Sequence, residues 1–159
     1  MNVLATGSSG LIGSALLSSL SPAGHRITRL VRSQPRAEAG EFYWDPQTGQ
    51  LDAAGLERAD AVVHLAGESI AERWTPQKKV RIRDSRVKGT RLLCDALARL
   101  ENPPRVLVNA SAIGYYGDRG DAVLQEESAP GSGFLAEVCR EWEGATESAA
   151  RAGIRVVRG

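Results

Sequence analysis

Three glycines near the N-terminus have the spacing of a phosphate-binding turn. Gly7, Gly10 and Gly13 lie between a short apolar run, Val3–Thr6, and a segment with helical spacing, Leu11–Leu20. In such a turn the first glycine permits the tight bend, the second lets a pyrophosphate approach the backbone, and the third lets helix and strand pack closely. The helix N-terminus then offers free N–H groups to the phosphates. The pattern predicts a dinucleotide site; the alternative is a tight turn without a ligand.

We expect every residue of this turn to take part in cofactor binding. In chain order these residues are Gly7, Ser8, Ser9, Gly10, Leu11, Ile12 and Gly13. The two serines add hydroxyl donors to the backbone N–H groups. The spacing is G-x-x-G-x-x-G, so the prediction depends on its position between a strand and a helix as well as on the glycines.

The end of the second apolar strand, Arg26–Val31, indicates which dinucleotide binds. An acidic residue about 20 positions beyond the turn would bind the ribose 2′-hydroxyl of NAD. The chain has Arg32 there, with Arg36 nearby and no Asp or Glu between them. A planar guanidinium pairs well with a phosphate. We therefore expect NADP as the cofactor; the alternative is a solvated surface arginine.

The elements that position these residues alternate between short β-type runs and longer helical segments. The predicted strands are Val3–Thr6, Arg26–Val31, Glu41–Trp44, Ala61–Ala66, Arg105–Ala110 and Ile154–Arg158. The predicted helices are Leu11–Leu20, Pro76–Leu100 and Phe134–Arg151, and the stretch Asp45–Gly55 is turn-rich. This alternation implies right-handed βαβ crossovers. We predict an α/β fold, a Rossmann-type doubly wound parallel sheet of about six strands in the order 3-2-1-4-5-6.

A long loop, Gly114–Ser132, leaves the carboxyl end of the fifth predicted strand. Loops of this length are usually functional or mobile. In open α/β sheets ligands bind at the carboxyl edge. The loop therefore adds a second candidate region at the edge that carries the glycine turn.

The composition is that of one ordinary globular domain, and we assign residues 1–159 to a dinucleotide-binding domain. Because the chain stops directly after the last predicted strand, we expect a substrate-binding part to follow Gly159 in a longer protein. Twenty basic residues against 19 acidic ones give a net charge of +1, which provides no general field for nucleic acid. No apolar run approaches the ~20 residues that a membrane span needs.

The two cysteines, Cys94 and Cys139, lie far apart and form no Cys-x-x-Cys pair. They suit a reducing compartment and argue against a disulfide framework or a metal site. The N-terminus has no basic segment and no cleavage site of a signal peptide. The simplest expectation is a cytoplasmic protein with a small-molecule substrate.

On these residues the chain resembles the extended short-chain dehydrogenase/reductase superfamily, which includes NAD(P)-dependent sugar epimerases and dehydratases. The resemblance is carried by Thr6–Gly13, Ala59–Gly67 and Val87–Thr90. More closely, the chain is similar to an atypical branch of "epimerase family" proteins. The segments specific to that branch are Leu65–Ile70, Arg73–Trp74, Ser85–Val87, Ser111–Gly117 and Cys139–Glu143.

The resemblance implies that Leu65, Ala66 and Gly67 pass the adenosine half of the cofactor. It also implies that Arg86, which replaces the usual Asn, reaches the cofactor from the long helix. Six other cations share that helix, and we interpret most of them as a solvated face: Lys78, Lys79, Arg81, Arg83, Lys88 and Arg91. Two packed long helices are a common dimer surface in the superfamily, so the resemblance also allows a homodimer.

The resemblance breaks down at the catalytic residues. In the superfamily a Tyr-x-x-x-Lys pair carries the proton chemistry, with an upstream Ser or Thr, and the lysine charge lowers the tyrosine pKa. Ser111 stands at the end of the fifth strand, where the helper hydroxyl belongs. The pair itself is absent: one register places Phe134 and Val138 at its positions, and the next places Leu135 and Cys139.

Tyr115 and Tyr116 are the substitute acid/base candidates, because they follow Ser111 in the active-site loop. Tyr116 matches a superfamily tyrosine that usually shapes the site. Cys139 resembles the branch's replacement for the lysine, and its alternative is a buried helix cysteine. We interpret His64 as a core histidine and His25 as a loop residue. The loop carboxylates are interpreted as solvated: Asp118, Asp121, Glu126 and Glu127.

Two functions remain in competition. The first is an NADP-dependent oxidoreductase or epimerase acting on a small hydroxylated substrate such as a nucleotide sugar. The second is a non-catalytic NADP-binding module that senses redox state or regulates a partner. The absence of Tyr-x-x-x-Lys favours the second, and the retained Ser111 and tyrosine pair favour the first.

Overall fold

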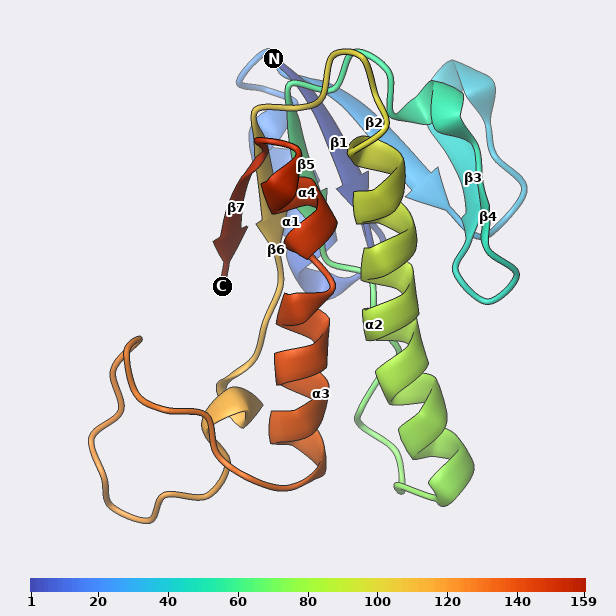
Figure 1. Cartoon of the computed structure of the whole chain (residues 1–159). Coiled ribbons are helices and arrows are strands. Elements are labelled where there is room, and N and C mark those ends of the chain that lie inside the picture. The colour runs from blue at the N-terminus through green and yellow to red at the C-terminus, as the bar shows by residue number, and fades with distance from the viewer.

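Seven strands form one sheet in the order β4-β3-β2-β1-β5-β6-β7, in a computed structural model that describes all 159 residues (Figure 1). All but β4 pair in parallel, which confirms the predicted order 3-2-1-4-5-6. These parallel strands are β1 Asn2–Thr6, β2 Arg26–Val31, β3 Glu41–Asp45, β5 Ala61–His64, β6 Val106–Asn109 and β7 Arg155–Arg158. Because they run the same way, their carboxyl ends share one edge of the sheet.

The seventh strand, β4, was not predicted. It comprises only Gln50–Leu51 and pairs antiparallel with the end of β3, in the register Trp44↔Leu51. Two residues are too few to show a period in the sequence. The turn between the two strands contains Gly49 in the left-handed region, with φ of 73°. The resulting β3–β4 hairpin extends the sheet beside the end of β2 (Figure 1).

The helices cover the two faces of the sheet unequally. Figure 1 shows α2 (Pro76–Leu97), α3 (Phe134–Gly144) and α4 (Glu147–Arg151) in front of the sheet and α1 (Leu11–Leu20) behind it. The main core lies between the sheet and the front helices. Its buried members are Leu4, Leu30, Trp44, Leu56, Val62, Leu93, Cys94, Leu97, Leu107, Ala149 and Ile154. Cys94 is therefore a core residue, and both cysteines are free thiols.

Local chemistry explains where α2 begins and why the last predicted helix is divided. The Thr75 hydroxyl accepts a hydrogen bond from Lys78 N at 3.1 Å, and Pro76 occupies the first turn of α2, where its missing N–H costs nothing. The sequence predicts one helix over residues 134–151, but the structure has α3 and α4. After Gly144, the Thr146 hydroxyl donates to Glu143 O at 2.6 Å, a local bond that competes with helix continuation.

Three short 3₁₀ helices complete the fold: η1 (Ala37–Ala39), η2 (Ala53–Gly55) and η3 (Ile113–Tyr116). η3 shows that the predicted loop Gly114–Ser132 begins with an ordered turn rather than an irregular one. The rest of that loop projects from the body below β6 (Figure 1). No helix of the chain combines the length and the apolar composition that crossing a membrane requires.

Candidate cofactor site

The glycine turn has the geometry of a backbone cradle. Gly7 adopts φ of +65°, and a Cβ atom there would lie 2.7 Å from Leu65 C. A Cβ atom at Gly13 would lie 2.3 Å from Gly7 O. Gly10 caps α1 without a side-chain hydrogen bond, so the first N–H groups of the helix keep their bonding capacity for a ligand. Only glycine fits at Gly7 and Gly13, and the cradle suits a pyrophosphate.

A buried polar network fixes the two strand ends that flank the cradle. His64 Nδ1 lies 2.6 Å from Thr6 Oγ1, and His64 Nε2 lies 3.0 Å from Thr90 Oγ1 on α2. The Thr6 hydroxyl also accepts a hydrogen bond from Ala66 N at 3.3 Å. Burial lowers the His64 pKa to about 4. The imidazole is therefore neutral near pH 7, and His64 is the satisfied core histidine that the sequence predicts.

A cleft of about 590 Å³ opens beside the cradle, within the range of small-molecule sites. Its floor is the glycine turn and the end of β5, and its walls are the end of β2, the β3–β4 hairpin and α2. Lining residues from these five places are Gly7, Ser8, Ser9, Gly10, Arg32, Ser33, Pro46, Gln47, Leu65, Ala66, Gly67, Arg81 and Ser85. The structure thus brings most of the predicted cofactor residues into one cavity.

Four predicted cofactor residues lie outside the lining. Gly13 is buried behind the turn, where it allows the close approach of Gly7 O. Leu11 and Ile12 open α1 and are 89% and 69% exposed. The fourth, Arg86, lies behind the wall that residues 67 and 68 form. Whether Leu11, Ile12 and Arg86 touch the cofactor stays a prediction.

Arg86 contacts the segment after β5 that lines the cleft, but does not itself line the cleft. Its Nη1 donates to Glu68 O at 3.0 Å and to Ile82 O at 3.2 Å, and its guanidinium lies 5.2 Å from the Trp142 ring centroid. A Cβ atom at Gly67 would lie only 3.1 Å from Arg86 Cζ. Burial lowers the pKa of Arg86. The side chain therefore connects α2, α3 and the segment after β5.

Glu41 engages two of the arginines that line the cleft. Its carboxylate accepts hydrogen bonds from Arg36 Nη2 at 2.7 Å and Nε at 3.1 Å, and Arg29 Nη2 lies 3.0 Å away. The hydrogen bond from Arg36 holds the pKa of Glu41 at about 2. Arg36, expected to assist with the 2′-phosphate, thus already has a partner. Arg32 has no carboxylate partner and is exposed.

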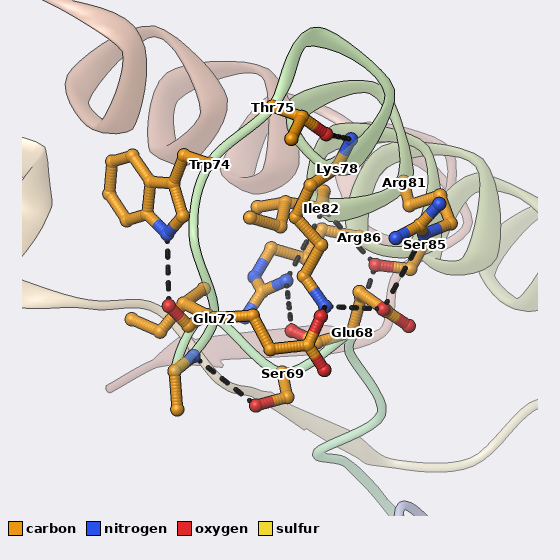
Figure 2. Close-up of polar contacts among 12 residues, drawn as sticks. Glu68, Ser69, Glu72, Trp74, Thr75, Lys78, Arg81, Ile82, Ser85 and Arg86 are labelled. Carbon is orange, nitrogen blue, oxygen red and sulfur yellow. Dashed lines mark hydrogen bonds and ion pairs between the residues drawn. The ribbon is translucent and has the colours of Figure 1, made fainter.

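The segment after β5, residues 68–75, is fastened to α2 by Lys78. Lys78 Nζ donates to Glu68 Oε1 at 2.7 Å and to Glu72 Oε2 at 2.8 Å, and the side chain is only 2% exposed (Figure 2). Most of the α2 cations were expected to form a solvated face, and Lys78 is an exception because its side chain is buried. Its two partners lie in a preceding segment without periodicity, so helical spacing alone could not reveal the burial. We call residues 68–75 the strap.

Replacing Lys78 with Met is expected to release the strap while leaving the sheet folded. The substitution keeps an unbranched side chain that is one atom shorter, and it leaves the carboxylates of Glu68 and Glu72 without their shared cation. Amide hydrogen exchange over residues 68–75 should become roughly tenfold faster or more, because local opening loses these contacts. The matched control is Lys88→Met on the same helix, where an exposed pair with Asp84 contributes little. Equal exchange in the two variants would contradict the role of Lys78.

Ser111 lies at the carboxyl end of β6, but its hydroxyl already has a partner. Ser111 Oγ donates to Glu143 Oε1 on α3 at 2.6 Å. Glu143 was not predicted as a site residue, although it stands four residues after Cys139, on the same helical face. Cys139 is buried and its Sγ lies 3.9 Å from Ala112 O. Burial raises the Cys139 pKa, which fits a structural thiol.

The two candidate tyrosines lie in η3, next to α3. The rings of Tyr115 and Tyr116 pack edge to face, with centroids 5.3 Å apart. Gly131 N donates to Tyr115 O at 2.9 Å and thereby closes the base of the long loop. The loop carboxylates are exposed, as the sequence predicts. The chain thus brings Ser111 and the tyrosines to the carboxyl end of one strand, and neither register of the missing Tyr–Lys pair, Phe134/Val138 or Leu135/Cys139, supplies a tyrosine or a lysine.

Comparison with known proteins decides the family. The model of the NAD dependent epimerase/dehydratase family matches residues 3–140. The chain belongs to this family. It is 46% identical over 156 residues to the epimerase family protein Mb2239 of Mycobacterium bovis, covering 98% of this chain and 51% of that one. The resemblance to the epimerase-family branch is thereby confirmed.

Two solved structures share the fold. A nucleoside-diphosphate sugar epimerase from Corynebacterium glutamicum has a TM-score of 0.87 and 43% identity, covering 99% of this chain and 33% of that one. Human epimerase family protein SDR39U1, solved with NADPH, has a TM-score of 0.83 and 31% identity, covering 99% and 52%. This chain spans about half the length of the Mycobacterium and human proteins.

Proposed function

We propose that this chain forms the NADP(H)-binding part of an oxidoreductase or epimerase acting on a small hydroxylated substrate, such as a nucleotide sugar. The observation that carries the proposal is the cleft. The cleft contains the glycine cradle, whose close backbone contacts leave no room for Cβ atoms. It also contains Arg32 at the end of β2, which lacks a carboxylate partner. A pyrophosphate fits the first feature, and a 2′-phosphate fits the second.

The named relatives support the two parts of this proposal. NADPH is the cofactor in the structure of human SDR39U1, and the Corynebacterium relative is named for a nucleoside-diphosphate sugar. In the cleft, Gly7–Gly10 would hold the pyrophosphate and Leu65–Gly67 would border the adenosine. Glu41 would not compete for the ribose, because Arg36 and Arg29 already engage its carboxylate.

Replacing Arg32 with Gln is expected to weaken NADPH binding roughly tenfold to a hundredfold and to leave NADH binding nearly unchanged. The change removes one charge-assisted hydrogen-bonding partner of the 2′-phosphate, which NADH lacks. Isothermal titration calorimetry with both cofactors measures the ratio. Arg26→Gln is the matched control, because Arg26 is exposed at the opposite end of the same strand. An equal loss for both cofactors would count against a 2′-phosphate site at Arg32.

The bound nicotinamide would supply or accept a hydride, and the chain would have to supply the proton chemistry. We assign that role to Tyr116 and Tyr115, whose phenols follow the end of β6. Ser111 is the third candidate, and its hydroxyl hydrogen bond to Glu143 ties the end of β6 to α3. We place the substrate-binding part outside residues 1–159, because the relatives are about twice as long.

A second candidate function is a non-catalytic NADP-binding module. The absence of a Tyr–Lys pair favours it, since neither Phe134 and Val138 nor Leu135 and Cys139 reproduce a tyrosine beside a lysine. Transfer of deuterium from deuterated nucleotide sugars to NADP⁺, or from labelled NADPH to keto forms of the same sugars, with the full-length protein, separates the two. Transfer that is lost in a Tyr115→Phe, Tyr116→Phe double variant supports the enzyme. Tight NADPH binding without transfer to any sugar supports the module. A homodimer through α2 and α3 stays a prediction.

A further inference from the structure

We infer that Arg81 of α2 is a second specificity-determining residue, which binds the cofactor 2′-phosphate together with Arg32 from the opposite wall of the cleft. The inference rests on the proposed function, because it adds a residue to the same NADP site. Arg81 is one of six cations that share α2 with Arg86, most of which were expected to form a solvated face. In the structure it lines the cleft instead.

The charges of the cleft do not balance. Four arginines line it: Arg29, Arg32, Arg36 and Arg81. Glu41 is only 7% exposed, and its single charge is shared between Arg29 and Arg36 at 3.0 and 2.7 Å. The other lining carboxylate is Glu68. The cleft therefore holds more positive charge than its own carboxylates offset.

Glu68 accepts a short hydrogen bond from Lys78 and forms only a longer ion pair with Arg81. The Lys78 Nζ to Glu68 Oε1 distance is 2.7 Å, whereas Arg81 Nε lies 3.7 Å from the same oxygen, beyond hydrogen-bond length (Figure 2). The Arg81 side chain is 51% exposed. Its guanidinium thus retains its hydrogen-bond donors for a ligand, as does that of Arg32.

The two arginines act on a common region of the cleft. The pKa of Glu68 is lowered first by its hydrogen bond from Lys78, and also by the charges of Arg81 and Arg32. Both guanidinium groups also line the same cleft, Arg81 from α2 and Arg32 from the end of β2. This position suits an anion between the two walls.

One face of α2 forms the wall that carries Arg81. Arg81, Ser85 and Gly89 follow at intervals of four residues and so share that face. At Gly89 the helix meets the β3–β4 hairpin, where an added Cβ would lie 3.5 Å from Pro46 Cβ. A phosphate monoester carries a charge of about −1.5 to −2 near neutral pH. Such an anion matches two guanidinium groups, whereas the 2′-hydroxyl of NADH would neutralise neither.

The test compares 2′,5′-ADP with 5′-AMP and NADPH with NADH, using Arg81→Gln and Arg32→Gln variants of the purified full-length protein. Arg81→Gln should weaken the binding of 2′,5′-ADP and NADPH roughly tenfold. It should change the affinities for 5′-AMP and NADH less than about twofold. Arg81→Lys keeps the charge without the planar fork of the guanidinium, so it should lose less affinity for 2′,5′-ADP and NADPH than Arg81→Gln does. Arg91→Gln, an exposed arginine on the same helix and outside the cleft, should change none of the four affinities. Unchanged melting temperatures establish that each variant is folded.

The failures of the two proposals are distinguishable. If Arg32→Gln weakens the binding of 2′,5′-ADP while Arg81→Gln does not, the role of Arg81 is overturned and the NADP site at Arg32 stands. An equal effect of Arg81→Gln on 2′,5′-ADP and 5′-AMP overturns it as well, because Arg81 would then bind another part of the nucleotide. If the wild-type protein binds NADH as tightly as NADPH, the proposed cofactor preference itself fails.

Discussion

Replacing Gly13 with Ala is expected to weaken NADPH binding severely and to destabilise the fold. The new Cβ would lie 2.3 Å from Gly7 O and 2.8 Å from Ser8 Cα. Both are backbone atoms of the cradle, so the turn must move to relieve the overlap. Overpacking of this kind costs about 1–3 kcal/mol, and sometimes more. Displacing the N–H groups of the cradle should weaken NADPH binding by roughly a hundredfold or more, since several phosphate contacts are lost together.

Calorimetric titration and thermal unfolding together measure this effect. The matched control is Gly144→Ala at the end of α3, where an added Cβ meets nothing within 4 Å. That variant should bind NADPH normally and melt at or slightly above the wild-type temperature, because Ala is a better helix former than Gly. A folded Gly13→Ala variant with wild-type affinity would show that the third glycine is dispensable.

Acidification is expected to destabilise the protein through His64 alone by about 3 kcal/mol between pH 6.5 and pH 4. In the folded state burial holds the His64 pKa at about 4, below its ordinary value of 6.5. As the pH falls, the unfolded state therefore binds a proton first, and folding loses free energy. The contribution is fully present above pH 6.5. It is lost progressively as the pH falls to about 4, at about 1.4 kcal/mol for each pH unit.

Urea unfolding at a series of pH values, with wild type and His64→Gln, checks this result. The variant is expected to be less stable at pH 7, since it disturbs the bonds to Thr6 and Thr90, but its stability should depend less on pH. His25→Gln serves as the control and should keep the wild-type slope, because His25 lies outside the core. Glu41, with a pKa of about 2, loses its contribution mainly below pH 4.5. Parallel slopes for wild type and His64→Gln would contradict the prediction.

Features that depend on local sequence could be predicted. The three glycines and the six parallel strands follow from spacing and apolar runs, and the order of the strands follows from the handedness of βαβ units. Arg32 could be placed at the end of β2, because the glycine turn sets the distance to it. The two-residue β4 and the division between α3 and α4 are too short or too subtle for periodicity to show.

Side-chain pairings between distant elements could not be predicted. Glu143 bonds Ser111 across 32 residues, and Lys78 is buried because two glutamates of the strap meet it. On a helical wheel Lys78 and Arg81 are equivalent surface cations. Only the packed strap distinguishes them, since it removes Lys78 from water and leaves Arg81 facing the cleft. For this reason a cation-rich helix could be recognised from the sequence, but its individual roles could not.

The fastening of the strap by Lys78 has a consequence for the kinetics of cofactor exchange. With Glu68 and Glu72 tied to Lys78, the strap moves as one body with the long helix that carries Arg81. The facing wall, residues 32–38, is exposed, and the carboxylate of Glu41 holds it at Arg36. Cofactor entry and release should therefore proceed by displacement of residues 32–35. The residence time of NADPH should then depend on how often residues 32–35 move away from the cleft, rather than on any motion of the strap.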